Sequence, residues 1–325
     1  MEDFKVERYA SSHYSEWNAF LLGAKNATFL FHRDFMEYHN DRFEDFSLMV
    51  YKKGKLFALL PANKVGNKVY SHQGLTYGSL VLLNKAKLTD AFYAFKKMLE
   101  FLFLNDIKKL DVRVIPSFYN TLPSDELAYF LFKADAKLIN RDALMVINYK
   151  HKLDFQKNRR EGINKAIRNG LSVKIDTNYE GFWNTILIPN LKNKHDALPV
   201  HTLNEIKLLA SRFPENIKQV SVYKDGEIVA GTTVFLTKTT IHPQYVSANV
   251  NKNALGSLDL AYDFIINKLS TYKSFFDFNI SSENKGAKLN LGLIFWKESC
   301  GARTYVADNY VVKTKAFKTL MIDAV

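Results

Sequence analysis

Two short segments of this chain alternate apolar and polar residues around a glycine, and they resemble each other. Residues 50–58 read VYKKGKLFA and residues 222–230 read VYKDGEIVA, so five of nine positions are identical. Such alternation around a Lys-Gly or Asp-Gly pair predicts a strand, a two-residue turn and a second strand. We therefore expect one β-hairpin in each half of the chain.

Apolar residues at helical spacing follow both hairpins. They form one stripe in residues 88–104 and another in residues 258–269. Behind each predicted helix comes a short strand, then a second helix, then a closing strand. The ranges are 109–114, 124–133 and 143–149 in the first half, and 275–280, 285–298 and 304–312 in the second. Six elements in the same order indicate an internal repeat.

Helix-like sequence also opens each half. It covers residues 14–22 and 33–40 in the first half, and 155–169, 179–187 and 202–212 in the second. Thr202 and Glu205 have the spacing of a capping box. The predicted fold class is α/β, of the mixed α+β kind: two tandem domains, 1–150 and 151–325, each with a mixed, mostly antiparallel sheet flanked by helices.

Composition supports two globular domains and narrows the chemistry. The chain has 325 residues, 47% of them hydrophobic, which exceeds the usual size of one core. A single cysteine, Cys300, excludes an internal disulfide and a Cys-rich zinc site, and the histidines lack metal-ligand spacing, so we expect no metal. The start of the sequence has no apolar signal region, and no apolar run is long enough to span a bilayer. We expect a cytoplasmic protein without a transmembrane segment.

The net charge of +12 is concentrated between residues 150 and 168, where seven Lys or Arg accompany only two acidic residues. Such a cluster favours contact with phosphates, acidic sugars, nucleic acid or an anionic membrane. Arg159 and Arg160 are the expected anion-binding residues, because a guanidinium fork suits phosphate and carboxylate. A solvated basic helix face is the alternative interpretation.

Three stretches add a resemblance to a known family. They are Phe29–His32 with Ser71–Gly78; Arg159–Arg160 with Ile163–Ala166 and Asn169–Val173; and Ser282–Asn290 with Phe295–Lys297 and Gly301–Ala302. With the repeated element order, they resemble the tandem GNAT-like fold of the Fem-type transferases and their FemAB-like relatives. This resemblance implies two GNAT-like domains and an N-acyltransferase. It also implies substrate-binding roles for His72, Tyr77, Gly78, Ser282 and Asn290.

The resemblance implies transfer of an acyl or aminoacyl group from an activated donor to an amine of a sugar, amino acid or cell-envelope precursor. Acyl-CoA is the expected co-substrate, with Asn253, Gly256 and Ser257 at the position of the family's CoA loop. That loop departs from the usual pattern because it holds a single glycine. A tRNA-dependent Fem-type aminoacyltransferase is one alternative, although no tRNA-binding arm is evident. A non-catalytic binding module on a degenerate transferase fold is another.

Candidate catalytic residues lie in two places. The polar segment 192–202 holds His195 and His201, whose imidazoles suit proton removal from an amine, and Lys194 as a substrate contact. The resemblance places the acyl group where two central strands separate, with Tyr245 as a catalytic residue and Asn249 and Asn279 as further lining. Solvated loop histidines and satisfied strand hydrogen bonds are the alternatives. The sequence leaves the donor, the acceptor and the oligomeric state open.

Overall fold

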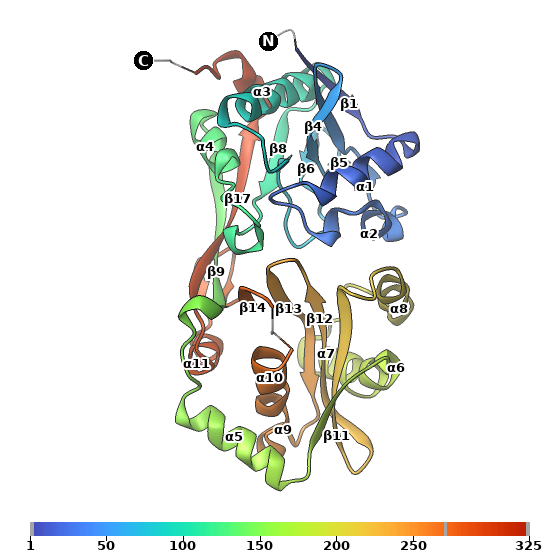
Figure 1. Ribbon diagram of the computed structural model, residues 1–325, viewed down its shortest axis with the longest axis vertical. Coiled ribbons are helices and arrows are strands. Elements are labelled where there is room, and N and C mark those ends of the chain that lie inside the picture. The colour runs from blue at the N-terminus through green and yellow to red at the C-terminus, as the bar shows by residue number, and fades with distance from the viewer. Residues whose placement is uncertain (1–2, 270–271, 323–325) are drawn as a thin grey trace. The chain divides into compact units, whose positions relative to one another are not determined.

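The computed structural model describes residues 3–269 and 272–322, which form two compact units (Figure 1). Unit 1 comprises residues up to 142, residues 284–287 and residues from 306 onward. Unit 2 comprises residues 143–283 and 288–305, apart from the two outside the described ranges. The predicted division into GNAT-like domains at residue 150 stays a prediction, since this grouping assigns the C-terminal residues to unit 1.

Unit 1 contains two small sheets and four α-helices within its described residues. The first sheet has the order β1-β3-β4-β7, and the second runs β2-β5-β6-β8-β17. The strands are β1 (Phe4–Arg8), β2 (Glu44–Asp45), β3 (Leu48–Lys52), β4 (Lys55–Leu60), β5 (Asn63–Val65), β6 (Lys68–Tyr70), β7 (Val81–Leu82), β8 (Lys109–Arg113) and β17 (Arg303–Lys313). The helices are α1 (Tyr14–Leu22), α2 (Arg33–Met36), α3 (Leu88–Leu104) and α4 (Glu126–Lys133).

Unit 2 is built on one sheet with the order β10-β11-β12-β13-β14-β9. The strands are β9 (Lys137–Asn148), β10 (Ser172–Asp176), β11 (Ile217–Lys224), β12 (Glu227–Leu236), β13 (Thr240–Ala248) and β14 (Phe275–Ile280), followed by the small hairpin β15 (Ser282–Glu283) and β16 (Lys288–Leu289). The helices are α5 (Lys157–Arg168), α6 (Tyr179–Phe182), α7 (Ile188–His195), α8 (Leu203–Arg212), α9 (Lys252–Leu255), α10 (Ser257–Asn267) and α11 (Leu291–Ser299).

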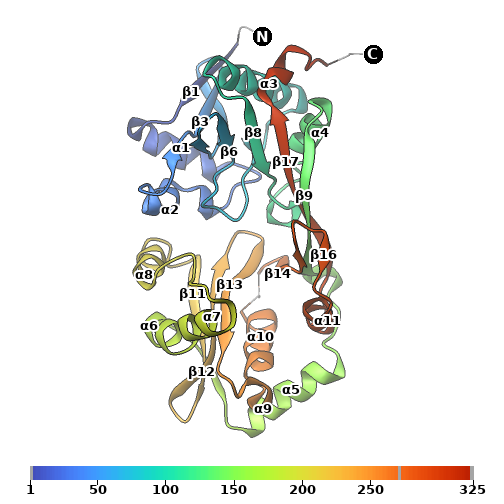
Figure 2. The same ribbon diagram turned by 180° about the vertical axis from the view of Figure 1, so that it is seen from behind.

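Helices cover both faces of the unit 2 sheet. Figure 2 shows α10 on one face and α6, α7 and α8 on the other. On the α10 face, Val234, Ile241 and Phe276 pack with Ile265 in one apolar core. Because side chains alternate along a strand, their neighbours Phe235, His242 and Asp277 point to the opposite face.

Both predicted hairpins are confirmed, and they share a detail that the sequence did not predict. Val50 pairs with Ala58 and Val222 with Ala230, and the register shifts at the next residue in both hairpins. The turn residues also match, with positive φ at Lys53 and Gly54 and at Asp225 and Gly226. The same bulge beside the same turn supports a common origin for the two hairpins.

The closing strands differ from the predicted arrangement. Residues 144–148 of β9, predicted to complete the first half, pair antiparallel with β14 of unit 2. Residues 309–313 of β17, predicted to complete the second half, pair antiparallel with β8 of unit 1. The closing strands are therefore exchanged between the two units. Local patterning could not reveal this exchange, because it predicts a strand for both segments and does not show which neighbour each strand pairs with.

Three predicted helix limits were wrong. The helix predicted over residues 285–298 begins only at Leu291, because Asn284, Lys285 and Gly286 take positive φ in the turn between β15 and β16. The helix predicted over 179–187 continues through a π-helical turn (Trp183–Leu187) into α7, so residues 192–195 are helical rather than loop. The α-helix predicted over 33–40 ends at Met36 and continues as a 3-10 turn.

The capping box predicted at the start of the helix over 202–212 is confirmed, since Thr202 and Glu205 cap α8 reciprocally. Among the described residues, none of the helices has the length and apolar character needed to cross a membrane.

Candidate active site

The strands β13 and β14 of unit 2 run parallel but separate almost at once. Among the described residues, their parallel register consists of two pairs, Thr240 with Phe275 and Ile241 with Phe276. Further along β13, the register with β12 skips Gln244, which forms a β-bulge. Two central strands that part in this way leave backbone groups and side chains available to a ligand.

A buried histidine and a buried aspartate meet at the point where the strands separate. Nδ1 of His242 lies 3.2 Å from Oδ2 of Asp277, and both side chains are 4% exposed. Among the described residues, Nε2 of His242 has no hydrogen-bond partner. A carboxylate on Nδ1 fixes the imidazole so that Nε2 can accept a proton. This is the arrangement of a general base with its orienting group.

Lys297 of α11 lies beside the same point. Its ammonium donates to the backbone oxygens of Asn279 and Ile280, at 3.0 and 2.8 Å, and to Oγ of Ser281 at 2.9 Å. These three bonds use all three protons of the ammonium group. Burial lowers the pKa of Lys297 to about 8, while the Asp277 carboxylate opposes that shift. Lys297 therefore holds the end of β14 and the residue after it, and supplies a positive charge there.

Two predicted catalytic residues do meet on the face covered by α6–α8. Nδ1 of His201 lies 2.5 Å from the Tyr245 hydroxyl, which also accepts the backbone N–H of His201 at 3.1 Å. The Tyr245 ring packs edge-on against Trp183. Burial raises the pKa of Tyr245, so the hydroxyl stays protonated near neutral pH. Phe235 also contacts His201, which places this pair on the same face as His242.

The opposite face of unit 2 carries a cavity of about 1010 Å³ between α5, α10 and α11. Its apolar wall includes Val246, Leu258, Tyr262, Leu293 and Trp296, and its cationic groups are Arg159, Lys165, Arg168 and Lys252. The acidic residues in the lining are Glu161 and Asp259, and Asp259 is paired with Arg159. The cavity thus has a positive rim and an apolar wall, which suits a ligand with an anionic part and an apolar part.

Helix α5 closes the N-terminal end of α10. A Cβ atom at Gly256 would lie 2.1 Å from the backbone oxygen of Gly162, so α5 packs directly on this glycine, whose φ is +72°. Arg159 donates to Oδ1 of Asp259 across the same contact, at 2.6 Å. Burial raises the pKa of Asp259, and the Arg159 guanidinium opposes this. Helix α5 thus packs against the start of α10, the position at which a helix often holds phosphate.

Several predicted site residues of unit 2 lie at or near the cavity. Arg159 and Asn253 line it, and Gly256 and Ser257 form the covered start of α10. Arg160 points away and donates to the backbone oxygen of Phe155 at 2.7 Å.

Other predicted residues of unit 2 have structural contacts. Oδ1 of Asn290 caps α11, Oγ of Ser282 accepts the N–H of Ala143, and Asn249 forms the turn after β13. Asn279 has a positive φ, and its backbone oxygen accepts a bond from Lys297. Lys194 is exposed on α7. His195 ends that helix, and its side chain lies outside the described part of the chain.

His72, Tyr77 and Gly78 lie in unit 1. His72 is buried with φ near +60°, and burial lowers its pKa to about 3. Tyr77 donates to Oγ1 of Thr28 at 3.2 Å, and a Cβ atom at Gly78 would clash with Ser71. Tyr77 and Gly78 therefore have structural roles in the described contacts, while His72 borders a cavity of about 300 Å³.

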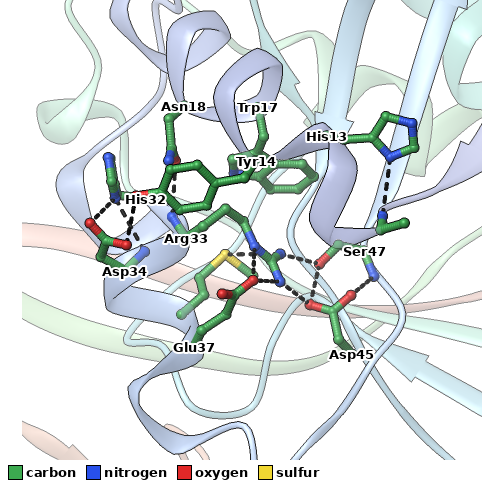
Figure 3. A network of polar contacts seen from close by, with 12 residues as sticks. His13, Tyr14, Trp17, Asn18, His32, Arg33, Asp34, Glu37, Asp45 and Ser47 are labelled. Atoms are coloured by element: carbon green, nitrogen blue, oxygen red, sulfur yellow. Dashed lines mark hydrogen bonds and ion pairs between the residues drawn. The ribbon is translucent and has the colours of Figure 1, made fainter.

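The buried Arg33 lines this cavity of about 300 Å³. Figure 3 shows the polar contacts around it. Arg33 pairs with Glu37 at 2.7 Å and with Asp45 at 2.8 Å, and its guanidinium lies 3.7 Å from the centre of the Tyr9 ring. These contacts neutralise the charge of Arg33, so the network stabilises unit 1.

Sequence reasoning missed His242 and Asp277, and it quoted Lys297 only as part of a motif. One signal for the pair was present: Asp277 interrupts the apolar run Phe275–Phe278, and His242 interrupts the run before Tyr245. A charged residue in a buried strand needs a partner. Among residues 3–269 and 272–322, no three His, Cys, Asp or Glu side chains form a metal-binding group.

Comparison with known proteins identifies the fold. FemX has a TM-score of 0.66 at 11% identity, with 98% of this chain and 99% of FemX covered. L-PGS from Bacillus licheniformis has a TM-score of 0.59 at 12% identity, covering 98% and 99%.

The chain therefore shares its fold with FemX and with L-PGS. A conserved protein of unknown function from Bacteroides thetaiotaomicron shares this fold with a TM-score of 0.57 at 11% identity, covering 95% and 99%. No family model and no curated protein matches the sequence. At these identities the likeness concerns the fold alone, so the Fem-type fold leaves the substrates to be inferred from the site.

Proposed function

We propose that this chain transfers an acyl or aminoacyl group from an activated donor to an amine, with the reaction centre in unit 2. The observation that carries the proposal is the His242–Asp277 pair beside Lys297, at the point where β13 and β14 separate. An acyl transfer to an amine needs a group that takes the amine proton and a positive field near the carbonyl oxygen. Both are present here within one unit of the Fem-type fold.

The two faces of the sheet have different roles in this proposal. The donor lies in the cavity between α5, α10 and α11, and its carbonyl reaches the strand separation. The amine approaches from the face that carries His201 and Tyr245. His242 takes the proton from the amine at Nε2, and Asp277 holds the imidazole and stabilises the imidazolium. As the amide C–N bond forms and the ester C–O bond of the donor breaks, the imidazolium returns this proton to the leaving ribose oxygen. Because the donor and the acceptor come from opposite faces, the two strands can hold the reacting atoms in contact.

The donor contacts favour a ligand whose anionic part is held by side chains. A CoA pyrophosphate bound at the N-terminus of α10 would have to fit beside Gly162 of α5, which packs on Gly256. The exposed cations Lys165 and Arg168, with the half-buried Lys252, can instead bind phosphates along a chain. This supports aminoacyl-RNA over acyl-CoA as the donor. The acceptor class remains the amine of a sugar, an amino acid or a cell-envelope precursor.

A transfer assay with two donors tests the proposal. The protein is incubated with a mixture of radiolabelled aminoacyl-tRNAs, or with acetyl-CoA, and with a panel of amino sugars, amino acids and peptidoglycan precursors. We expect a labelled amide product with aminoacyl-tRNA, and loss of that product in the Asp277→Asn variant. Product from acetyl-CoA alone would overturn the choice of donor. Full activity of the Asp277→Asn variant would overturn the proposed reaction centre.

A further inference from the structure

Helix α11 exposes large apolar side chains to solvent. Leu291 and Phe295 lie one helical turn apart, on the same side of the helix, and are 71% and 61% exposed. Leu289, just before the helix, is 51% exposed. We call these three residues the apolar strip. Exposed apolar side chains that gather on one element mark an interaction surface more often than scattered ones do.

Cations flank the apolar strip on the side of residues 150–157. This segment runs beside the end of α11, because the backbone N–H of Gln156 donates to the oxygen of Ser299 at 2.9 Å. It carries the exposed residues Lys150, Lys152 and Lys157, and Leu153 adds a further apolar side chain that is 42% exposed. The acidic residue within this segment is Asp154. The segment therefore combines positive charge with apolar surface.

Cations also lie on the other side of α11. Leu293 and Trp296 form one wall of the large cavity, and Lys165 and Arg168 of α5 contribute to its lining. Ile167, between these two cations on α5, is 60% exposed. The apolar strip is thus bordered by basic residues on both sides, within unit 2.

We propose that the apolar strip and its basic flanks dock unit 2 onto the surface of a lipid bilayer that contains anionic lipids. A bilayer surface binds both features: acyl chains accept Leu291 and Phe295, and anionic headgroups attract each nearby Lys or Arg. RNA would use the cations but has no need of the strip. A second copy of this chain, with a net charge of +12, would bring like charges together at the flanks. The proposal shares Lys165 and Arg168 with the proposed donor site, so its test uses residues outside that site.

Vesicle co-sedimentation tests the docking surface. The full chain is mixed with vesicles of phosphatidylcholine alone, or of phosphatidylcholine with phosphatidylglycerol. We expect binding to the mixed vesicles and little to phosphatidylcholine alone, with weaker binding at high salt. The double variant Leu291→Ser/Phe295→Ser should bind the mixed vesicles about tenfold more weakly, because two inserted side chains are lost. Lys150→Glu/Lys157→Glu should weaken binding by a similar factor.

A matched control separates this effect from general surface polarity. Leu22, at the end of α1 in unit 1, is 78% exposed, and Leu22→Ser should leave vesicle binding unchanged. Thermal unfolding shows that the variants are folded. Full vesicle binding by the Leu291→Ser/Phe295→Ser variant would overturn the proposal. If the charge variant also loses binding to RNA while the Leu291→Ser/Phe295→Ser variant keeps it, the basic flanks bind RNA instead. A dimer in light scattering that this variant abolishes, without any vesicle binding, would overturn it in favour of a second copy.

Discussion

The cavity between α10 and α11 in unit 2 has a counterpart between α3 and α4 in unit 1, and the two differ in what fills them. Leu88 and Phe92 of α3 correspond to Leu258 and Tyr262 of α10, because the same number of residues separates each pair in the sequence. All four residues line the two cavities. In unit 1 the cavity measures about 140 Å³, and Met321 and Ile322 of the C-terminal segment form one wall. In unit 2 it measures about 1010 Å³ and has a basic rim.

The pairs of parallel strands, β6 with β8 in unit 1 and β13 with β14 in unit 2, also differ in how far their bonding continues. In unit 1, backbone bonds continue beyond the pairing of β6 with β8. The N–H of Gly78 donates to the backbone oxygen of Arg113 at 2.7 Å. The N–H of Ser71 donates to the backbone oxygen of Asp111, and its Oγ accepts the N–H of Arg113. In unit 2, β13 and β14 part after two residue pairs, and His242 and Asp277 occupy the opening. The backbone bonding thus continues in unit 1, whereas in unit 2 two buried ionisable groups lie where the strands separate. This comparison favours unit 2 as the place of the chemistry.

The largest expected effect comes from removing the charge of Lys297. We expect Lys297→Met to lower the transfer rate about 10²- to 10³-fold, because the ammonium both holds residues 279–281 and supplies the positive field. Burial lowers the pKa of this group to about 8, so the rate in the wild type should fall as pH rises through about 8. A pH profile of the single-turnover rate measures both effects.

Two further variants sharpen the test of Lys297. Lys297→Arg keeps the charge to higher pH, so its alkaline limb should move up even if its rate is lower. Lys273→Met is the matched control, because burial also lowers the pKa of Lys273 but its ammonium binds the backbone oxygen of Thr237 instead. Equal losses in the two Met variants would show that the effect is one of stability.

An effect of similar size is expected from the proposed base. His242→Gln should lower the transfer rate about 10²- to 10³-fold, since proton removal by a positioned base contributes this much. Asp277→Asn should lower the rate less, and the double variant should be no worse than His242→Gln, because the two residues act as one unit. Rates of the three variants under single-turnover conditions give the comparison. If the two losses of rate multiply in the double variant, His242 and Asp277 act independently and the proposed pair is wrong.

A smaller effect is expected at the basic rim of the cavity. The double variant Lys165→Ala/Arg168→Ala should raise the KM for the donor about tenfold and leave kcat nearly unchanged, since these cations bind phosphate away from the reacting atoms. The effect should shrink at high salt. Lys157→Ala is the control, because Lys157 lies on the same helix but does not line the cavity. Equal increases in KM for the double variant and for Lys157→Ala would show that the cavity does not bind the donor.

The smallest effect on transfer is expected in unit 1. Leu320 is 1% exposed in the core of unit 1, and the Leu320 backbone oxygen accepts a bond from Lys96. Leu320→Ala should cost about 2–4 kcal/mol in the free energy of unfolding, because it leaves a cavity in a packed core. The transfer rate of the folded variant should change less than about twofold. A large loss of rate without loss of stability would show that unit 1 takes part in the chemistry.

Local elements were predictable, because hairpins and amphipathic helices depend on nearby residues. The alternation around Gly54 and Gly226 predicted two hairpins, and the stripe over 88–104 matches α3. Of the predicted site residues, His201 and Tyr245 lie in contact, and Arg159 and Asn253 line the cavity, while their roles stay predictions.

The rest depends on contacts between distant segments. The exchange of β9 and β17 follows from strand pairing across the chain, which local patterns do not encode. The pairing of His242 with Asp277 joins two strands whose neighbours are apolar, so each residue alone reads as an isolated polar site. The packing of α5 on Gly256 also brings together segments that the sequence predicted separately.

A crystal structure with a stable donor analogue tests the central claim most directly. A suitable analogue is 3′-amino-3′-deoxyadenosine acylated with an amino acid, whose amide cannot be transferred. The account predicts that the amide carbonyl lies at the separation of β13 and β14, beside Lys297, with the nucleoside in the cavity next to α5. An analogue bound in unit 1, or one that leaves the surroundings of His242 and Lys297 empty, would contradict the account.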